Sequence, residues 1–111
     1  MAQVIFTAPI LRKLAANYEK TRAAQAAGKP EPDHKPVVRV FNPTGAGTWY
    51  FTEIDPDGDR LFGLCEIHEQ ELGYASKSEL EAFRGRFGLR LERDIHFKGD
   101  KPLSAYRRVP A

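Results

Sequence analysis

The sequence has little cysteine and no long apolar run, and both absences limit the kinds of protein that it can encode. Cys65 is the one cysteine among 111 residues, so the chain cannot form an internal disulfide bond. Small secreted domains usually contain several such bonds, and we therefore expect a protein of the reducing cytoplasm. No stretch approaches the roughly 18 apolar residues of a membrane span, and no basic leader precedes the short apolar run near Met1. We expect neither export nor membrane insertion.

The composition is that of a folded domain. Hydrophobic residues make up 41% of the chain and charged residues 29%, which is typical of a globular protein rather than a disordered one. The length suits a single core, and we assign residues 1–111 to one domain. Residues 29–36, KPEPDHKP, are predicted to form an extended proline-rich linker. His34 lies in it and is expected to be exposed and without a role. Residues 102–111 are expected to form a tail.

Charge is distributed unevenly along the chain. The formal net charge is +2, but residues 50–72 contain seven acids and only one base, Arg60, and so carry −6. The remaining residues therefore carry +8. Such a partition is typical of a protein with one acidic and one basic face, which affects its choice of partners and its association rates. Solvated surfaces that neutralise one another are the alternative interpretation.

A long helix is predicted near the N-terminus. Thr7 is a suitable N-cap, and Pro9 falls in the first turn, where a missing amide donor does no harm. The apolar stripe then follows helical spacing through Leu11, Leu14 and Tyr18. Gly28 suits the left-handed position after the last turn, so the helix is expected to end there.

The rest of the chain alternates between strand and helix signals. Strands are predicted at residues 37–41, 48–54 and 61–67, the last two joined by the turn 55–59 with its Pro-Asp-Gly core. A capping box at residues 78–81 starts a short helix with a buried face of Leu80, Phe83 and Phe87, and alternation from Leu89 indicates a fourth strand. We predict an α+β fold with a small antiparallel sheet of about four strands and the element order α-β-β-β-α-β.

No catalytic, metal or cofactor site is predicted. Asp55, Asp57 and Asp59 resemble the start of a calcium loop, but the glycine stands at the fourth position instead of the sixth. Cys65 has no second cysteine or histidine pair nearby that would complete a zinc site. A metal-dependent nuclease remains the least favoured hypothesis. It would need Glu53, Asp94 and His96 to converge on one divalent cation.

Direct nucleic-acid binding is a stronger alternative. Residues 84–108 contain eight bases and three acids, and such a cluster can bind phosphates. The candidate binding residues are Arg84, Arg86, Arg90 and Arg93. The same arginines could instead pair with neighbouring carboxylates on the second helix and the fourth strand.

Several sequence blocks are characteristic when taken together. They are Trp49-Tyr50-x-Thr52-Glu53, Leu61-Phe62-Gly63, Glu71-Leu72-Gly73-Tyr74, Ser76-x-Ser78-Glu79-Leu80 and Gly88-Leu-x-Leu91-Glu92-Arg93-Asp94. In this order they resemble a domain-of-unknown-function family of small single-domain proteins, and the match covers residues 11–103. The resemblance implies a gene carried on a plasmid, phage or integrative element. Some members of that family look like anti-CRISPR proteins, which inhibit Cas9-type effectors.

The resemblance and the charge pattern together predict a non-enzymatic anti-defence protein that binds a nucleic-acid-guided effector of the host. The low net charge argues against a whole-surface DNA mimic and favours a local acidic patch. The predicted partner-binding residues are Asp55, Asp57, Asp59, Glu69, Glu71 and Tyr74.

Overall fold

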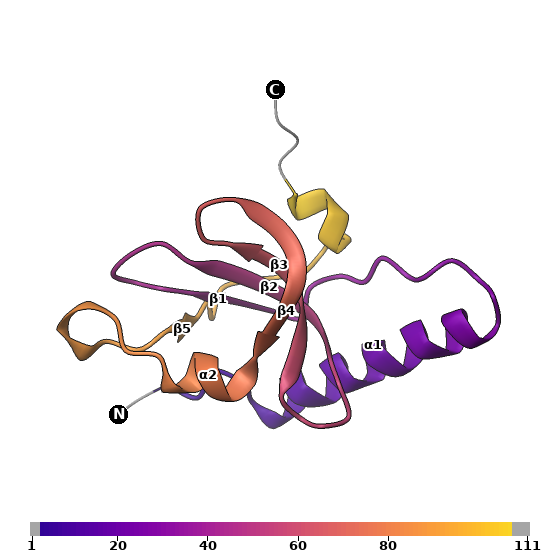
Figure 1. The fold of residues 1–111 in the computed structure, drawn as a ribbon, viewed down its shortest axis with the longest axis horizontal. Helices are drawn as coiled ribbons and strands as arrows, with labels where there is room; N and C mark the ends of the chain where they lie inside the picture. Colours follow the sequence, from indigo (N-terminus) through magenta and orange to yellow (C-terminus); the bar gives the residue numbers. More distant parts are fainter. Residues whose placement is uncertain (1–2, 108–111) are drawn as a thin grey trace.

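A computed structural model describes residues 3–107 and contains one five-stranded antiparallel sheet with two α-helices (Figure 1). The elements are α1 (Ala8–Ala26), β1 (Val38–Phe41), β2 (Thr48–Ile54), β3 (Arg60–Glu66), β4 (Gln70–Ser76), α2 (Lys77–Ala82), β5 (Glu92–Arg93) and the short 3-10 turns η1 (Arg86–Gly88) and η2 (Leu103–Tyr106). The strand order is β4-β3-β2-β1-β5. The predicted α+β class is confirmed. Among residues 3–107, no helix is long and apolar enough to span a bilayer.

Helix α1 begins and ends where its sequence signals predict. The carbonyl of Thr7 accepts a hydrogen bond from the amide of Leu11 at 2.9 Å, and Pro9 lies in the first turn. After the last turn, Gly28 adopts a left-handed backbone with φ +67°, which glycine adopts without steric cost. Leu14 faces the sheet and is fully buried, so the helix is fixed by packing as well as by its ends.

One face of the sheet forms the core. Its strands contribute alternate residues, among them Val38, Val40, Phe51 and Leu61, which are at most 2% exposed. This face is closed by α1, the segment before it and α2, and the core cluster comprises Ile5, Phe6, Leu14, Val38, Val40, Trp49, Phe51, Ile54, Leu61, Leu80 and Leu91. The opposite face is covered only in part, by the C-terminal segment with η2 (Figure 1). There the rings of Tyr50, Phe97 and Tyr106 contact one another.

The sheet has one strand more than the sequence indicated. Residues 70–76 form β4, which pairs with β3 over its whole length, from Gln70 opposite Glu66 to Ser76 opposite Arg60. The predicted order α-β-β-β-α-β has no strand at these residues. The signal was weak because β4 is an edge strand with exposed Glu71, Leu72 and Tyr74, so its side chains do not alternate between apolar and polar.

The second half of the chain corrects further details. Helix α2 is capped by Ser76, whose hydroxyl accepts from the amide of Glu79 at 3.2 Å, and not by Ser78. It ends at Ala82, so Phe83 and Phe87 do not form the predicted buried face and are 37% and 86% exposed. The predicted fourth strand shrinks to the two residues of β5, because Leu91 is the buried residue there while Leu89 and Ile95 lie in solvent.

Candidate functional site

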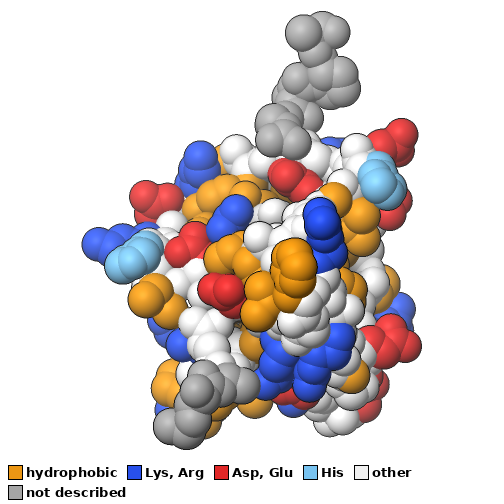
Figure 2. Space-filling model, turned by 90° about the vertical axis from the view of Figure 1, so that its left-hand side faces the viewer, with side chains coloured by type: hydrophobic (Ala, Val, Ile, Leu, Met, Phe, Trp, Pro, Cys, Tyr) orange, Lys and Arg blue, Asp and Glu red, His pale blue; other side chains and the backbone are white. Residues whose placement is uncertain are grey.

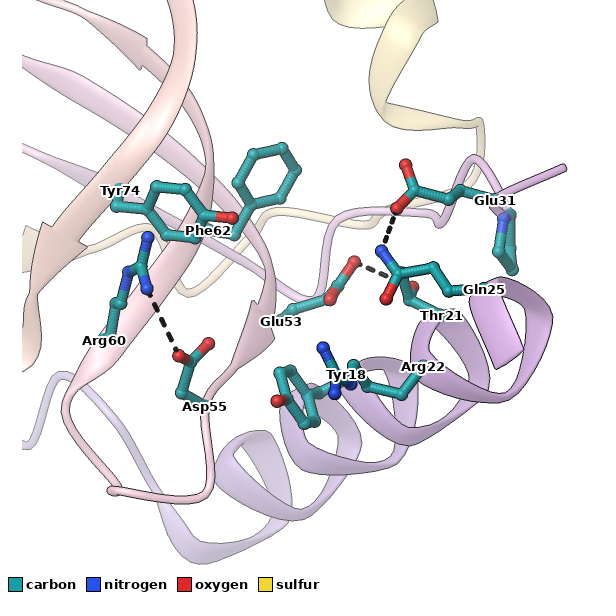
Figure 3. Close-up of a pocket in the computed structure, with 11 residues that line it drawn as sticks. Tyr18, Thr21, Arg22, Gln25, Glu31, Glu53, Asp55, Arg60, Phe62 and Tyr74 are labelled. Atoms are coloured by element: carbon teal, nitrogen blue, oxygen red, sulfur yellow. Dashed lines mark hydrogen bonds and ion pairs between the residues drawn. The ribbon is translucent and has the colours of Figure 1, made fainter. Parts of the chain in front are cut away.

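A polar hollow opens between the second half of α1, the linker and the edge of the sheet (Figure 3). Its volume is about 370 Å³. We call it the α1–β4 groove, and it is lined by Tyr18, Thr21, Arg22, Gln25, Glu31, Pro32, Glu53, Asp55, Arg60, Phe62 and Tyr74. It therefore contains two of the predicted partner-binding residues, Asp55 and Tyr74.

A β-bulge in β2 turns Glu53 into this groove. Phe51 pairs with Gly63 and Glu53 pairs with Phe62, so Thr52 is an extra residue on β2. Strict alternation would place Glu53 beside core residue Leu61, but the added residue moves its carboxylate to the face that Phe62 and Tyr74 share. The bulge thus keeps the core apolar and supplies the groove with a carboxylate.

Glu53 belongs to a half-buried polar cluster with Thr21 and His34. The hydroxyl of Thr21 lies 3.0 Å from Glu53 Oε2, to which it donates, and 2.9 Å from His34 Nε2. His34 Nε2 is 3.9 Å from the same carboxylate oxygen, and the two side chains are only 9% and 13% exposed. The prediction that His34 is exposed was therefore wrong. Its carbonyl also accepts from the amide of Leu103 at 2.9 Å, which joins the linker to the C-terminal segment.

Burial is the main influence on the acidity of Glu53. Desolvation raises its pKa above the ordinary value, while the hydrogen bond from Thr21 and the proximity of His34 lower it by a smaller amount. The carboxylates of Glu31 and Asp55 add to the upward shift. A cation placed in the groove would offset this cost, because an opposite charge stabilises the ionised carboxylate.

The groove already holds one cation against an aromatic ring. The guanidinium carbon of Arg60 lies 3.7 Å from the ring centre of Tyr74, and its Nη1 is 3.8 Å from the carboxylate of Asp55. The ring of Phe62 is 5.2 Å from that of Tyr74. Aromatic faces beside carboxylates are a suitable environment for basic side chains, and Arg60 shows that this site accepts one.

The open edge of β4 lies next to the groove. The amide of Lys77 donates to the carbonyl of Asp59 at 2.8 Å. Asp59 and Lys77 continue the register of β3 and β4, and they form a hydrogen-bonded pair of this ladder. Because such pairs alternate in an antiparallel ladder, the backbone N–H and C=O groups of Leu72 and Tyr74 point away from β3. The two side chains are 49% and 57% exposed. An edge of this kind can pair with a strand of another chain.

The predicted acidic patch is divided between the two ends of β3. Asp57 Oδ1 accepts from the amides of Asp59 and Arg60, and the carboxylate of Asp59 accepts from the Ser76 hydroxyl and the Ser78 amide. These bonds hold the pKa of both aspartates below the usual range. Glu69 and Glu71 lie near the other end of β3, which is about 20 Å away for a seven-residue strand. Their role in binding stays a prediction.

The four candidate arginines differ in how they are held. Arg93 donates to the carbonyls of Val4 and Ile5, and thus fastens the start of the chain to β5. Arg90 donates to the carbonyl of Glu81 at 3.3 Å. Arg84 donates to the carbonyls of Glu81 in α2 and Phe83. Arg86 extends into solvent beside Phe87, with its guanidinium carbon 5.6 Å from the ring centre.

Phe87 itself has a strained backbone with φ 61°. The left-handed region costs a non-glycine residue about 1–2 kcal/mol. The ring is 86% exposed, so little burial offsets that cost. The loop from residue 83 to 89 closes through its own backbone, since the amide of Gly85 donates to the carbonyl of Leu89 at 2.7 Å.

The structure does not gather the residues of the nuclease hypothesis. Glu53 bonds to Thr21 in the groove, whereas Asp94 pairs with Arg39 at 3.1 Å and accepts from the amide of His96. Within residues 3–107, no cluster of three or more His, Cys, Asp or Glu side chains could hold a metal ion. Cys65 packs against the core, and burial raises the pKa of its thiol. Its side chain therefore acts as a small apolar group.

Comparison with known proteins identifies one family. The model of the DUF2958 family, described as a protein of unknown function, matches residues 5–110. The chain belongs to this family. Neither the curated proteins nor the solved structures contain a match. The DUF2958 assignment confirms the resemblance to a domain of unknown function.

The sequence of this DUF2958 domain had not pointed to Thr21 or His34. Thr21 continues the apolar stripe of α1 three residues after Tyr18 and is 8% exposed, so a hydroxyl at a core-facing position was the available signal. No signal in the sequence pointed to His34, because the linker that carries it has no periodic pattern. The contact with Glu53 depends on the bulge and on the path of the linker, which only the tertiary structure provides.

Proposed function

We propose that this DUF2958 protein is a non-enzymatic binding protein that captures an extended, basic segment of a partner protein along β4 and the α1–β4 groove. One observation carries the proposal. An edge strand with outward backbone groups and exposed Leu72 and Tyr74 lies directly beside a groove that combines aromatic rings with carboxylates. Pairing with β4 supplies affinity through the main chain, and the side chains next to it supply specificity.

The charges along this surface favour a basic partner. Glu69 and Glu71 flank one end of β4, and Glu31, Glu53 and Asp55 line the groove at the other. The groove also contains Arg22 and Arg60, but Arg60 is already engaged by Asp55 and Tyr74. A partner strand paired with β4 presents alternate side chains to opposite faces, so its apolar residues on the groove face would contact Leu72 and its basic residues on the other face would lie near Glu71.

Following the family resemblance, we propose that the partner is a nucleic-acid-guided effector of a host defence system, similar to Cas9. Such proteins have basic channels that hold nucleic acid through its backbone. An inhibitor with an acidic edge strand can occupy one wall of such a channel without mimicking DNA over its whole surface. The protein then acts in the cytoplasm for a mobile element.

The surface can be tested without knowing the partner. We expect a peptide of about ten alternating Lys and Val residues to shift the backbone amide NMR signals of Leu72 and Tyr74, because a peptide of strand length pairs with an open edge. Leu72→Asp should abolish these shifts, and Leu89→Asp is a matched control at 47% exposure elsewhere on the surface. Equal shifts with a Glu-Val peptide, or shifts confined to other elements, would contradict the proposal.

The partner class is tested by inhibition. Purified Cas9-type effectors with bound guide are mixed with the protein, and target cleavage is timed at several salt concentrations. We expect inhibition that weakens as salt rises and that falls at least tenfold in Glu71→Lys. Glu19→Lys, an exposed charge reversal on α1, should leave inhibition unchanged. Full cleavage activity with every effector would refute the effector assignment, while the peptide experiment would still test the surface.

A further inference from the structure

A second surface lies away from the groove, at the loop from residue 83 to 89. The loop projects at the left of Figure 1, between α2 and β5, and Figure 2 looks onto this end of the molecule. On that face Lys and Arg side chains lie next to apolar ones (Figure 2). Residues 83–90 contain three arginines and no acid, so the loop is locally cationic.

The loop holds an aromatic ring out in solvent. Phe87 is 86% exposed, more than any other large apolar residue of the described chain. Its backbone is left-handed, and Gly88 after it is left-handed as well, with φ 71°. Backbone bonds from Gly88 to the Gly85 carbonyl at 3.1 Å and from Leu89 to the Arg86 carbonyl at 3.2 Å close the turn. The fold thus fixes the backbone that carries the ring without burying the ring.

The turn between β1 and β2 supports this loop from behind. A Cβ added to Gly85 would lie 2.9 Å from the hydroxyl of Thr44, so the two turns are in close contact. Asn42 fixes Thr44 in turn, because its Oδ1 accepts from the Thr44 amide at 3.0 Å. A strained and exposed aromatic residue on a supported turn is an observation from which a binding role can be inferred.

We propose that the loop from residue 83 to 89 binds single-stranded nucleic acid, with one base stacked on Phe87 and phosphates held by Arg84 and Arg86. Both arginines are exposed, and the guanidinium carbon of Arg86 lies 5.6 Å from the ring centre of Phe87. Aromatic faces next to cations are the elements that bind single strands without sequence preference. A duplex keeps its base faces covered, whereas a single strand offers them. Arg84, Arg86 and Phe87 do not line the α1–β4 groove, so the inference stands independently of the proposed function.

The test is fluorescence anisotropy with a labelled oligothymidine of about 12 nucleotides, a usual site size for single-strand binders. Phe87→Gly removes the ring and suits the left-handed backbone, so the fold is retained. We expect it to weaken binding about tenfold. Replacing both Arg84 and Arg86 by Gln should reduce the slope of log affinity against log salt by about 1.4. Arg12→Gln replaces an exposed arginine on α1 and is the control for loss of charge.

Three results with the loop variant and with other ligands would overturn the inference. They are equal affinity of Phe87→Gly and the parent protein, equal affinity for a duplex of the same length, or equal affinity for polyglutamate, which would indicate an acidic protein as the ligand. Leu72→Asp on β4 serves as a second control and should leave oligothymidine binding unchanged. A loss of binding in that variant would instead assign the nucleic acid to the β4 surface.

Discussion

The α1–β4 groove and the loop from residue 83 to 89 are held in shape by different kinds of contact. At the α1–β4 groove, side chains hold one another, since Thr21, Glu53 and His34 form a cluster that water reaches only in part. At the loop from residue 83 to 89, the backbone holds the shape and the side chains of Arg86 and Phe87 extend into solvent. Substitutions in the groove should therefore change stability, whereas loss of the exposed side chains in the loop should mainly change binding.

The largest effect should come from the sheet that supports the groove. In Gly63→Ala, the new Cβ would lie 1.9 Å from the carbonyl oxygen of Tyr50, so β2 and β3 would have to separate. We expect a loss of about 3 kcal/mol or more in the free energy of unfolding, measured by urea denaturation. Gly73→Ala is the matched control, because Gly73 pairs with Gly63 but its Cβ would meet no atom within 4 Å. A similar loss in both variants would contradict this explanation.

The polar cluster of the groove should give the next largest effect. Thr21→Val keeps the shape of the side chain but leaves Glu53 and His34 without their shared hydroxyl, at a cost of about 1–3 kcal/mol. Thr21→Ser retains the hydroxyl and should cost less than Thr21→Val. Thermal unfolding of both variants beside the parent protein checks the order. If Thr21→Val is as stable as the parent, the cluster does not stabilise the fold.

The arginines allow the comparison to be made within one residue type. Arg93→Gln removes hydrogen bonds to the carbonyls of Val4 and Ile5, and should cost about 1–2 kcal/mol because these bonds involve a charged donor. Arg86→Gln, in the loop, should change stability by less than about 0.5 kcal/mol. Chemical denaturation of the two variants measures the difference. Equal costs would remove the distinction between a structural and an exposed arginine.

The smallest effect concerns pH. Because the pKa of Glu53 is raised in the folded state above its ordinary value of 4.5, its protonated form is favoured by folding. The contribution of Glu53 to stability is therefore fully present below pH 4.5 and is lost as pH rises through the folded pKa. Glu53→Gln removes this dependence, so its stability relative to the parent should increase from pH 4.5 to pH 7.

The pKa shifts of Asp57 and Asp59 have the opposite sign to that of Glu53. Hydrogen bonds lower the pKa of each below 3.8, so their contribution is present above pH 3.8 and is lost as pH falls through the folded pKa. Unfolding curves recorded above pH 4.5 therefore separate the contribution of Glu53 from those of Asp57 and Asp59. A variant Glu53→Gln whose stability runs parallel to that of the parent over this range would show that Glu53 does not titrate differently on folding.

Local signals in the sequence determined the parts of the fold that depend on neighbouring residues. Thr7, Pro9 and Gly28 set the limits of α1, and the Pro-Asp-Gly turn set the hairpin of β2 and β3. The sequence did not indicate the edge strand β4, because β4 pairs with a strand on one side only and its side chains are mostly exposed. Helix α2 was placed nearly correctly, although its cap lies at Ser76, since a second serine of equal capping strength stands two residues later.

The sequence by itself determined the α+β class, the long first helix and the presence of acidic and basic segments, because spacing and turn chemistry act over a few residues. Only the tertiary structure decided which charged groups meet. It divided the acidic residues between the two ends of β3, bonded Arg93 to the start of the chain, and brought Glu53 to Thr21 and His34 through one extra residue in β2. Such contacts join residues far apart in the chain, and they follow from packing and register, which no local pattern specifies.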